Sequence, residues 1–362
     1  MNKHKVVVFG PSLGAVSGVS THVRMLIDSD LSRHFELMHF QVGSEGRNEN
    51  ALQRLSRLAF GPFSLAFLLM RSRAEIVHLN TSLDAKGYWR DLVFAAVTKA
   101  LGRRVINQIH GGAMPQDFFG GNALLTWILR RFLVASDVVT VLSSAELAAY
   151  KAFDPRIKIH LIPNAIDPVG LANVARPYNT SGPLNLVYVG RLVRGKGLFE
   201  LVEALAQMKS EGRRFTLLVA GDGPDRTALI AATERAGLKD RVRFLGTVFA
   251  DNKRRLLLES DLFVFPSYSE GLPYSLLEAM AAGCVPVTTA VAAIPDVMRD
   301  GQHGLFVPVR DPRALAKAMA SCDDDRASLA RMAEAARQRI LEHYTLPRLA
   351  DDFRGLYDRC LC

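Results

Sequence analysis

The sequence predicts an α/β protein built from two doubly wound domains, each with a parallel sheet. Its 362 residues suffice for two domains at roughly 100 to 200 residues each. Short apolar runs alternate with segments of helical period, and this alternation stops near the middle of the chain and then restarts. With 49% hydrophobic and 22% charged residues, both domains are expected to be globular.

The first domain is predicted over residues 1–168. Its opening VVVFG is a continuous apolar run that ends at a glycine, as expected for a parallel strand buried on both faces. Similar runs follow at 35–42, 75–80, 104–109, 137–142 and 158–163. The helical segments between them complete the βαβ rhythm of a doubly wound sheet.

A linker is predicted over 169–183, where apolar residues become sparse. The second domain, 184–345, repeats the pattern, with strand-like runs at 184–190, 215–221, 242–246, 261–266 and 284–289. The last residues, 346–362, have helical spacing after a break near Pro347, so one helix should stop there and another should finish the chain.

Charge and cysteine content exclude several classes of protein. The net charge is +9, of which residues 1–170 contribute +6, an excess that suits a phosphorylated or lipid-linked acceptor, an anionic membrane surface or simply a soluble basic face. The basic residues are too dispersed for a nucleic-acid module. Four cysteines without CxxC spacing indicate unpaired thiols: Cys284, Cys322, Cys360 and Cys362.

The sequence also favours a cytoplasmic protein. No apolar run approaches the roughly 18 residues of a membrane-spanning helix. The first residues, MNKHKVVVFG, pass directly into a predicted strand instead of forming a signal peptide.

Two doubly wound sheets in one chain create a cleft between the carboxyl ends of their strands, so the functional residues should lie in strand-to-helix loops. The first such loop follows Gly10 and places Gly14 and Gly18 before a helix that begins near Val19. Small residues and a helix start can accommodate a phosphate. The spacing is not that of GxGxxG, and an ordinary flexible turn is the alternative.

The corresponding loop of the second domain carries two cations, Arg191 and Lys196, at the end of a predicted strand. Together they could neutralise a diphosphate leaving group, although a solvated loop with two unrelated cations fits the same pattern. A third loop, 221–224, has the sequence GDGP, and here a structural turn in which Asp222 and Pro224 cap a helix is favoured.

Two glutamates, Glu270 and Glu278, flank a helix start at Pro273. Glu278 within the helix could accept hydrogen bonds from a ribose diol, and Glu270 in the loop is left for the sugar. A glycoside hydrolase is disfavoured, because eight helical positions span about 12 Å whereas hydrolases hold their carboxylates about 5 to 9.5 Å apart. The first turn should offer phosphate the N–H groups of Tyr274, Ser275 and Leu276.

Taken together, these segments resemble the retaining glycosyltransferases of family 4, which have the GT-B fold of two Rossmann-like domains facing across a cleft. The resemblance spans nearly the whole chain, in matching order and spacing. It rests on the glycine loop with GVSTHV, HGG at 110–112, PNAID at 163–167, GRLVRGKG at 190–197, GDGP at 221–224 and EGLPYSLLEAMAAGCVPV at 270–287.

The resemblance implies a role for each matching residue. Arg191 and Lys196 would hold the donor diphosphate, Glu278 the ribose and Glu270 a hydroxyl of the donor sugar. Gly14 and its neighbours would face the phosphates or the acceptor. His110, which on its own could be an ordinary loop histidine, would line the sugar site. The departing phosphate oxygen would take the acceptor proton on the face where the bond breaks, which retains the anomeric configuration.

The expected reaction moves a sugar from a UDP- or GDP-sugar to a glycan or lipid-linked acceptor, in bacterial-type polysaccharide or glycolipid synthesis. The resemblance also implies that the helix over 346–362 packs back on the first domain. A sugar-nucleotide epimerase of the same fold and a non-catalytic nucleotide-sugar-binding subunit are the alternatives. A nicotinamide dehydrogenase is less favoured, because neither domain carries the glycine fingerprint.

No metal and no other cofactor are expected. Metal-dependent transferases use a DxD sequence after a buried strand. In this chain the acidic runs 28–30 and 323–325 follow or separate helices instead.

Segment 54–73 places four arginines around an apolar centre with three phenylalanines. It could lie in a membrane interface at the inner face of a membrane and lead the enzyme to a lipid-linked acceptor. Segment 122–134 is a second candidate surface. For both, helices buried in a core with charged ends are the alternative.

Overall fold

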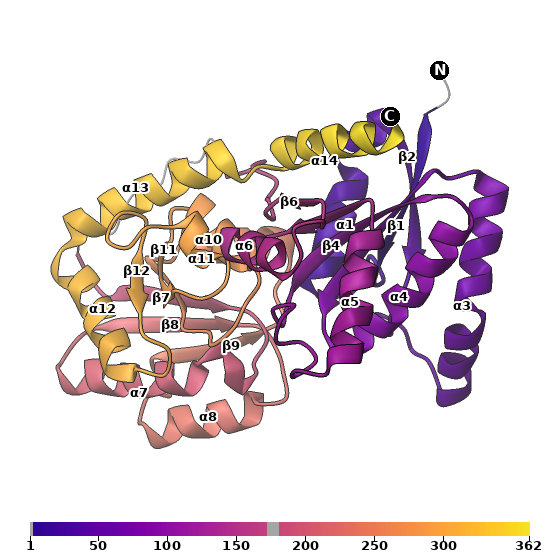
Figure 1. Cartoon of the computed structure of the whole chain (residues 1–362). Coiled ribbons are helices and arrows are strands. Elements are labelled where there is room, and N and C mark those ends of the chain that lie inside the picture. The colour runs from indigo at the N-terminus through magenta and orange to yellow at the C-terminus, as the bar shows by residue number, and fades with distance from the viewer. Residues whose placement is uncertain (1–2, 172–180) are drawn as a thin grey trace. The chain divides into compact units, whose positions relative to one another are not determined.

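The computed structural model describes residues 3–171 and 181–362 (Figure 1). The chain divides into two compact units, one made of Met1–Asp167 with Leu346–Cys362 and the other of Pro168–Thr345. The predicted linker, 169–183, begins close to this division. Its residues 172–180 lie outside the described part of the chain.

The first unit contains a six-stranded parallel sheet in the order β2-β1-β3-β4-β5-β6. All six apolar runs predicted for this half of the chain are strands: β1 His4–Gly10, β2 Phe35–Gln41, β3 Ile76–Leu83, β4 Arg104–Gly112, β5 Val138–Val141 and β6 Ile159–Leu161. The helices are α1 Gly18–Asp28, α2 Leu31–His34, α3 Ala51–Ser72, α4 Ala85–Ala100, α5 Ala123–Ala135, α6 Ser144–Phe153 and the C-terminal α14 Leu346–Leu361.

Helices cover both faces of this sheet, because successive side chains of a strand point to opposite faces. Val7 and Phe9 of β1 pack into a core with buried residues of α3, α4, α5 and α6. Val6 and Val8 pack into a second core with α1 and α14. The second core takes from α14 the side chains of Leu349, Ala350, Phe353, Leu356, Tyr357 and Cys360. The last helix is therefore an integral part of the first unit.

The second unit repeats the architecture, with a parallel sheet in the order β12-β11-β10-β7-β8-β9. Five strands confirm the predicted runs: β7 Leu184–Val189, β8 Phe215–Ala220, β9 Val242–Gly246, β10 Leu262–Phe265 and β11 Val285–Thr289. The sixth, β12 Leu305–Val307, was not predicted. The helices are α7 Leu198–Ser210, α8 Arg226–Arg235, α9 Ala250–Leu258, α10 Tyr274–Ala281, α11 Ile294–Val297, α12 Pro312–Asp324 and α13 Arg326–His343.

The helical break near Pro347 is confirmed, although the proline lies inside the first turn of α14 and not between the helices. A proline is tolerated there because the first N–H groups of a helix need no helical partner. The chain passes back to the first unit just before it, where the Leu346 N–H donates to the carbonyl of Ile166 at 2.8 Å.

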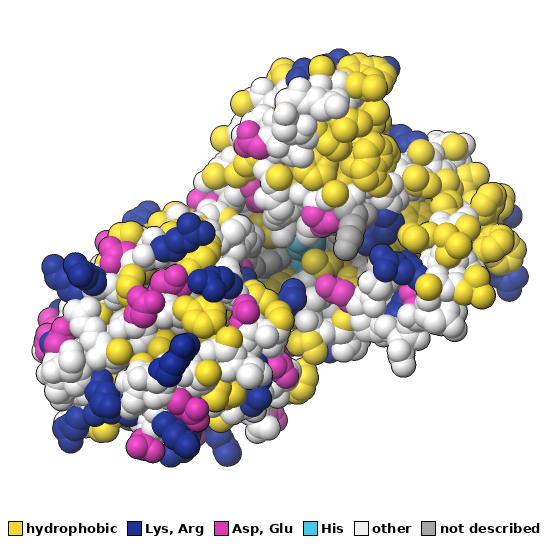
Figure 2. Space-filling model, turned by 90° about the horizontal axis from the view of Figure 1, so that it is seen from below, with side chains coloured by type: hydrophobic (Ala, Val, Ile, Leu, Met, Phe, Trp, Pro, Cys, Tyr) yellow, Lys and Arg dark blue, Asp and Glu magenta, His cyan; other side chains and the backbone are white. Residues whose placement is uncertain are grey.

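Helix α3 is exposed over most of its length. Only Leu65 and Leu69 are buried, so the alternative of a helix buried in a core is wrong for segment 54–73. Figure 2 shows hydrophobic side chains gathered at the right-hand end of the first unit, where α3 lies. Among the described residues, no helix is long and apolar enough to cross a membrane.

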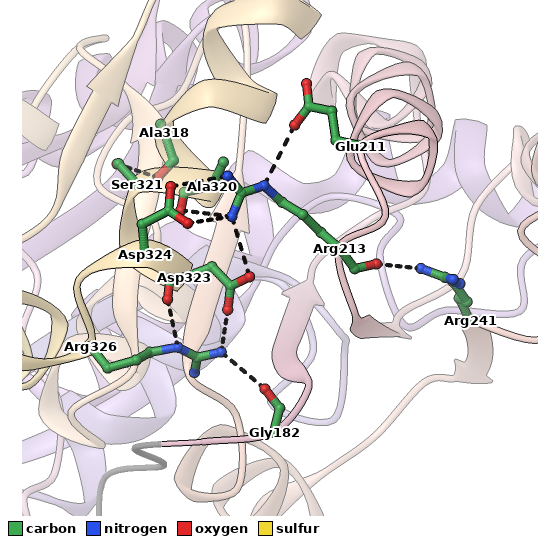
Figure 3. Close-up of polar contacts among 10 residues, drawn as sticks. All are labelled: Gly182, Glu211, Arg213, Arg241, Ala318, Ala320, Ser321, Asp323, Asp324 and Arg326. Carbon is green, nitrogen blue, oxygen red and sulfur yellow. Dashed lines mark hydrogen bonds and ion pairs between the residues drawn. The ribbon is translucent and has the colours of Figure 1, made fainter.

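The acidic run 323–325 is tied to arginines (Figure 3). Arg213, just before β8, forms a two-pronged contact with Asp324 at 2.7 and 3.0 Å. Arg326 bonds to Asp323 at 2.5 Å and to the carbonyl of Gly182 at 3.3 Å. Asp325 caps α13 by accepting from the Ser328 N–H. These acidic groups therefore fasten the α12–α13 turn to the amino end of the sheet.

Candidate active site

Two loops at the carboxyl edge of the second sheet carry most of the predicted site residues. They follow β7 and β10, which are neighbouring parallel strands, so their loops emerge side by side. The Tyr268 N–H donates to the carbonyl of Gly195 at 2.9 Å and the Ser267 hydroxyl donates to the same oxygen at 3.3 Å. The two loops are thus bonded to each other through their backbones.

This arrangement brings Lys196 and Glu270 into direct contact. The Lys196 ammonium donates to Glu270 Oε1 at 2.5 Å and lies 5.5 Å from the centre of the Phe265 ring. The Glu270 side chain is only 9% exposed. A carboxylate this buried needs a compensating charge, and the lysine provides it. The pair is the central feature of the candidate site.

A glycine controls where Lys196 lies. Arg194–Lys196 form a 3₁₀ turn that ends at Gly197, whose φ of +70° is in the left-handed region. A Cβ on Gly197 would lie 2.0 Å from the carbonyl oxygen of Pro266. The absence of a side chain lets the turn approach the β10 loop closely enough for Lys196 to reach Glu270.

Arg191 begins the same loop. Its backbone carbonyl accepts from the Tyr188 hydroxyl at 2.8 Å, which fixes the backbone where β7 ends. Its side chain is exposed. An exposed guanidinium on a fixed backbone is available to a phosphate arriving from solvent.

The start of α10 is close to this pair. Pro273 is the N-cap and forms no side-chain cap, as the sequence indicates. Tyr274 is buried and Ser275 is half-buried. The Leu276 N–H donates to the Pro273 carbonyl at 3.2 Å, so the expectation that it lacks a helical partner is wrong. A tightened first turn forms such i to i+3 bonds and leaves fewer N–H groups for an anion.

Glu278 lies one turn further into α10 and has a cationic partner that the sequence did not indicate. Its Oε1 accepts from Lys253 Nζ of α9 at 2.6 Å. Its Oε2 is buried and has no hydrogen-bond partner among the described residues. Burial raises the pKa of this carboxyl, and Lys253 opposes that shift. The unused oxygen can accept a hydroxyl hydrogen from a ligand.

The GDGP loop is a structural turn, as expected, but Asp222 is not a helix cap. It accepts from the N–H of Gly223, and α8 begins later, after Asp225. Cβ atoms on Gly221 and Gly223 would lie 1.9 and 2.3 Å from carbonyl oxygens of the β7 loop. The glycines therefore serve close packing of two backbones.

In the first unit, the glycine loop joins β1 to α1. The helix begins at Gly18, and Ser17 caps it by accepting from the Ser20 N–H at 3.3 Å. Gly14 is exposed, and a Cβ there would have a single neighbour within 4 Å, at 3.9 Å. Packing therefore does not require glycine at position 14. An exposed loop before a capped helix remains available to an anion.

His110 lies at the carboxyl end of β4, beside β3. Its Nε2 lies 2.8 Å from Asn80 Oδ1, and Asn80 Nδ2 in turn donates to the Phe9 carbonyl at 2.9 Å. Because the Asn80 oxygen can only accept, His110 donates through Nε2–H and keeps a lone pair on Nδ1. Burial holds its pKa well below 6.5, so the ring is neutral. A neutral imidazole can accept a hydrogen bond from a sugar hydroxyl.

Two further histidines lie beside His110. The His22 ring centre is 4.7 Å from that of His110. His78 lies 2.7 Å from the Tyr357 hydroxyl of α14 and 3.0 Å from Gln108 Oε1. Burial lowers the pKa of His22 to about 4 and that of His78 to about 3. All three rings are therefore neutral near pH 7.

Acidification is expected to destabilise the protein through these three histidines. Their folded pKa values lie below the unfolded value of about 6.5, so the unfolded chain takes up more protons as the pH falls. Stability is complete above about pH 6.5 and decreases toward pH 4, by about 1.4 kcal/mol per histidine for each pH unit. Urea unfolding at pH 7.5 and 5.5 measures this slope. His22→Asn should reduce this slope by about one proton.

The described residues contain no group of three or more His, Cys, Asp or Glu side chains arranged to hold a metal ion. The four cysteines are present as thiols, of which Cys284, Cys322 and Cys360 are buried and Cys362 is exposed.

The sequence predicted site positions for Lys196 and Glu270, which the structure brings into contact. It did not indicate the residues that contact the other two predicted side chains, Glu278 and His110. Lys253 lies in an Asn-Lys-Arg-Arg run that looks like any solvated helix face. Asn80 and Gln108 are polar residues inside otherwise apolar strands, and this was the available signal for a buried polar cluster.

The chain has two α/β units, each built on a six-stranded parallel sheet, and the second sheet carries a cation–carboxylate pair at its carboxyl edge. This is the architecture of a GT-B-type protein. Family models match both halves of the chain: "Glycosyltransferase Family 4" over residues 2–169 and "Glycosyl transferases group 1" over residues 176–339. The chain belongs to glycosyltransferase family 4.

A curated relative, the glycogen synthase of Mycobacterium tuberculosis, is 32% identical over 237 residues. The alignment covers 65% of this chain and 56% of the length of that enzyme.

Solved structures share the fold at low identity. Sucrose-phosphate synthase from Thermosynechococcus elongatus superimposes with a TM-score of 0.79 at 18% identity, covering 99% of each chain. Anabaena HepE in complex with UDP-glucose superimposes with a TM-score of 0.74 at 18% identity, covering 98% of this chain and 99% of HepE.

Proposed function

We propose that this protein is a retaining, metal-independent glycosyltransferase. It moves a sugar from a UDP- or GDP-sugar to a glycan or lipid-linked acceptor, in bacterial-type polysaccharide or glycolipid synthesis. The observation that carries this proposal is the contact between Lys196 and Glu270 beside the start of α10. The UDP-glucose bound to HepE supports a uridine diphosphate donor.

Each side chain then has a defined task. Arg191 and Lys196 neutralise the charge that grows on the diphosphate as the glycosidic bond breaks. The diphosphate competes with Glu270 for the Lys196 ammonium, and Glu270 is released to accept a sugar hydroxyl. Glu278, oriented by Lys253, accepts a ribose hydroxyl through Oε2. His110 accepts a hydroxyl hydrogen through Nδ1.

Retention needs no separate base in this scheme. The acceptor oxygen bonds to the anomeric carbon on the face from which the diphosphate leaves. The departing phosphate oxygen takes the acceptor proton, so the products are the glycosylated acceptor and the protonated nucleoside diphosphate. The same proposal includes contact with the inner face of a membrane through segment 54–73.

A donor panel with EDTA present tests the proposal. UDP-glucose, UDP-N-acetylglucosamine and GDP-mannose are added in turn, and one of them should raise the melting temperature by several degrees, because a ligand of the native state stabilises it. The same donor, labelled in its sugar, is then incubated with extracted lipids and glycans. Transferred label supports the proposal. An isomerised nucleotide sugar would indicate an epimerase, and binding without turnover would indicate a non-catalytic subunit.

A further inference from the structure

Exposed apolar side chains are concentrated on one part of the molecule. Within residues 3–171 and 181–362, eleven of the seventeen exposed large hydrophobic side chains belong to α3, α4 and α5. These three helices share the core on one face of the first sheet, so their outer surfaces lie on the same side of that sheet. The eleven are Leu52, Leu55, Leu58, Phe60, Phe63, Phe67, Met70, Trp89, Val93, Leu124 and Trp127.

On α3 these side chains form a stripe that faces away from the core. At about 100° per residue, six of the seven exposed apolar positions of α3 fall within about 140° of arc, and the centre of this arc is far from that of the buried pair, Leu65 and Leu69. Leu58 is the exception and lies on the side of that pair. The only polar residue within this arc is Ser56. Phe63 is 71% exposed and Phe67 is 62% exposed. Several large aromatic side chains exposed along one helix indicate a contact surface, because monomeric soluble proteins rarely expose large contiguous apolar patches.

The charge around the stripe has one sign. Segment 50–74 contains four arginines and no acidic residue. Arg54, Arg71 and Arg73 are exposed, while Arg57 bonds to Glu49, the nearest preceding carboxylate, at 2.9 Å. On α5, Arg131 lies over the ring of the exposed Trp127, at 5.5 Å from its centre. Counted at the same 100° per residue, Arg71 lies at the edge of the stripe, Arg73 follows the end of the helix, and Arg54 lies on the opposite side of the helix. An apolar stripe with arginines at its edge and end complements a surface that is apolar inside and anionic outside.

We infer that the outer face of α3, together with the exposed ends of α4 and α5, docks onto an anionic lipid surface. The phenylalanines and leucines enter the boundary between headgroups and acyl chains, the tryptophans lie at headgroup level and the arginines pair with lipid phosphates. A second copy of the chain fits this face less well. Two-fold pairing would bring the arginines of one copy against those of the other.

This docking deepens the membrane contact of the proposed function and rests on that part of it. It does not depend on the donor chemistry, because vesicle binding is measured without nucleotide. The full chain is floated with vesicles of phosphatidylcholine alone and with vesicles containing 30% phosphatidylglycerol, where the percentage is a choice of the experiment. The protein should float with the anionic vesicles and not with the neutral ones. Salt at about 0.5 M should release it, because the Debye length then falls to a few ångströms.

Substitutions on the stripe test the site itself. Phe63→Ser with Phe67→Ser should weaken partitioning at least tenfold, since each side chain contributes about tenfold or more by burial. Arg71→Gln with Arg131→Gln should weaken it about fivefold per arginine. The control is Leu161→Ser with Leu245→Ser, two exposed apolar positions on other elements, which should leave partitioning unchanged.

Folding and donor binding are checked separately. Because the changed side chains are exposed, every variant should keep its melting temperature and the shift produced by the nucleotide sugar. Equal binding to neutral vesicles, or no binding to either, would overturn the inference. A dimer that Phe63→Ser with Phe67→Ser converts to a monomer, with no flotation of the wild-type chain, would assign this face to a second copy instead.

Discussion

Lys196→Ala is expected to lower the kcat for sugar transfer by about 10²- to 10³-fold, the loss that follows removal of one preplaced charge donor from a transition state. Lys196 holds the Glu270 carboxylate in the free protein and, in the proposed reaction, the diphosphate as its charge grows. Its removal also leaves a buried carboxylate without a partner. Initial rates at saturating donor measure the effect.

Arg194 provides the matched control for this substitution. It lies in the same turn, carries the same charge and is exposed, and its guanidinium lies over the Phe199 ring at 5.2 Å from the centre. Arg194→Ala should leave kcat within about threefold of wild type, as expected of an exposed side chain that touches no reacting group. Equal losses in the two variants would assign the effect to the general charge of the loop, and an unchanged rate in Lys196→Ala would remove this residue from the mechanism.

Gly197→Ala is expected to destabilise the second unit by about 2 to 5 kcal/mol. An alanine would have to adopt a left-handed backbone conformation, and its Cβ would overpack the contact with the other loop. At φ +70° a Cβ would overlap the Pro266 carbonyl oxygen at 2.0 Å, so one of the two site loops must move. Transfer activity should decrease as well, because Lys196 moves with its turn. Chemical denaturation and initial rates provide both readings.

Gly195→Ala is the control, two positions earlier in the same loop. A Cβ there would have no neighbour within 4 Å, and its φ is not positive. Its stability should stay within about 0.5 kcal/mol of wild type. If both alanine variants proved equally stable, the close approach at Gly197 would not be what fixes the turn.

The sheets were predictable because buried parallel strands have a strong local signature. Runs such as VVVFG and LFVF contain no polar side chain, since both faces of the strand are covered. The strand over Leu305–Val307 was not predicted, because its three apolar residues stand between Gly304 and Pro308, two residue types that are typical of turns. The cleft between the two domains stays a prediction.

The candidate site could be predicted only from residues whose type and place in a loop indicate a chemical role. A cationic loop and a loop glutamate on adjacent strands led to Lys196 and Glu270. Contacts that depend on which helices pack together leave no such mark in the sequence. Lys253 reaches Glu278 because α9 and α10 are neighbours in space, and His78 meets Tyr357 although 279 positions separate them.

The place of α14 determines the order in which this protein can be completed during translation. Val6, Phe35 and Ile76 share one core with Phe353 and Tyr357, so a nascent chain that already holds every strand of the first sheet still lacks one of the helices that cover this face. The second unit is continuous in sequence and has all its parts before α14 is synthesised. Domains generally fold as units while the ribosome elongates the chain. The unit that the ribosome begins first is therefore the one that it completes last.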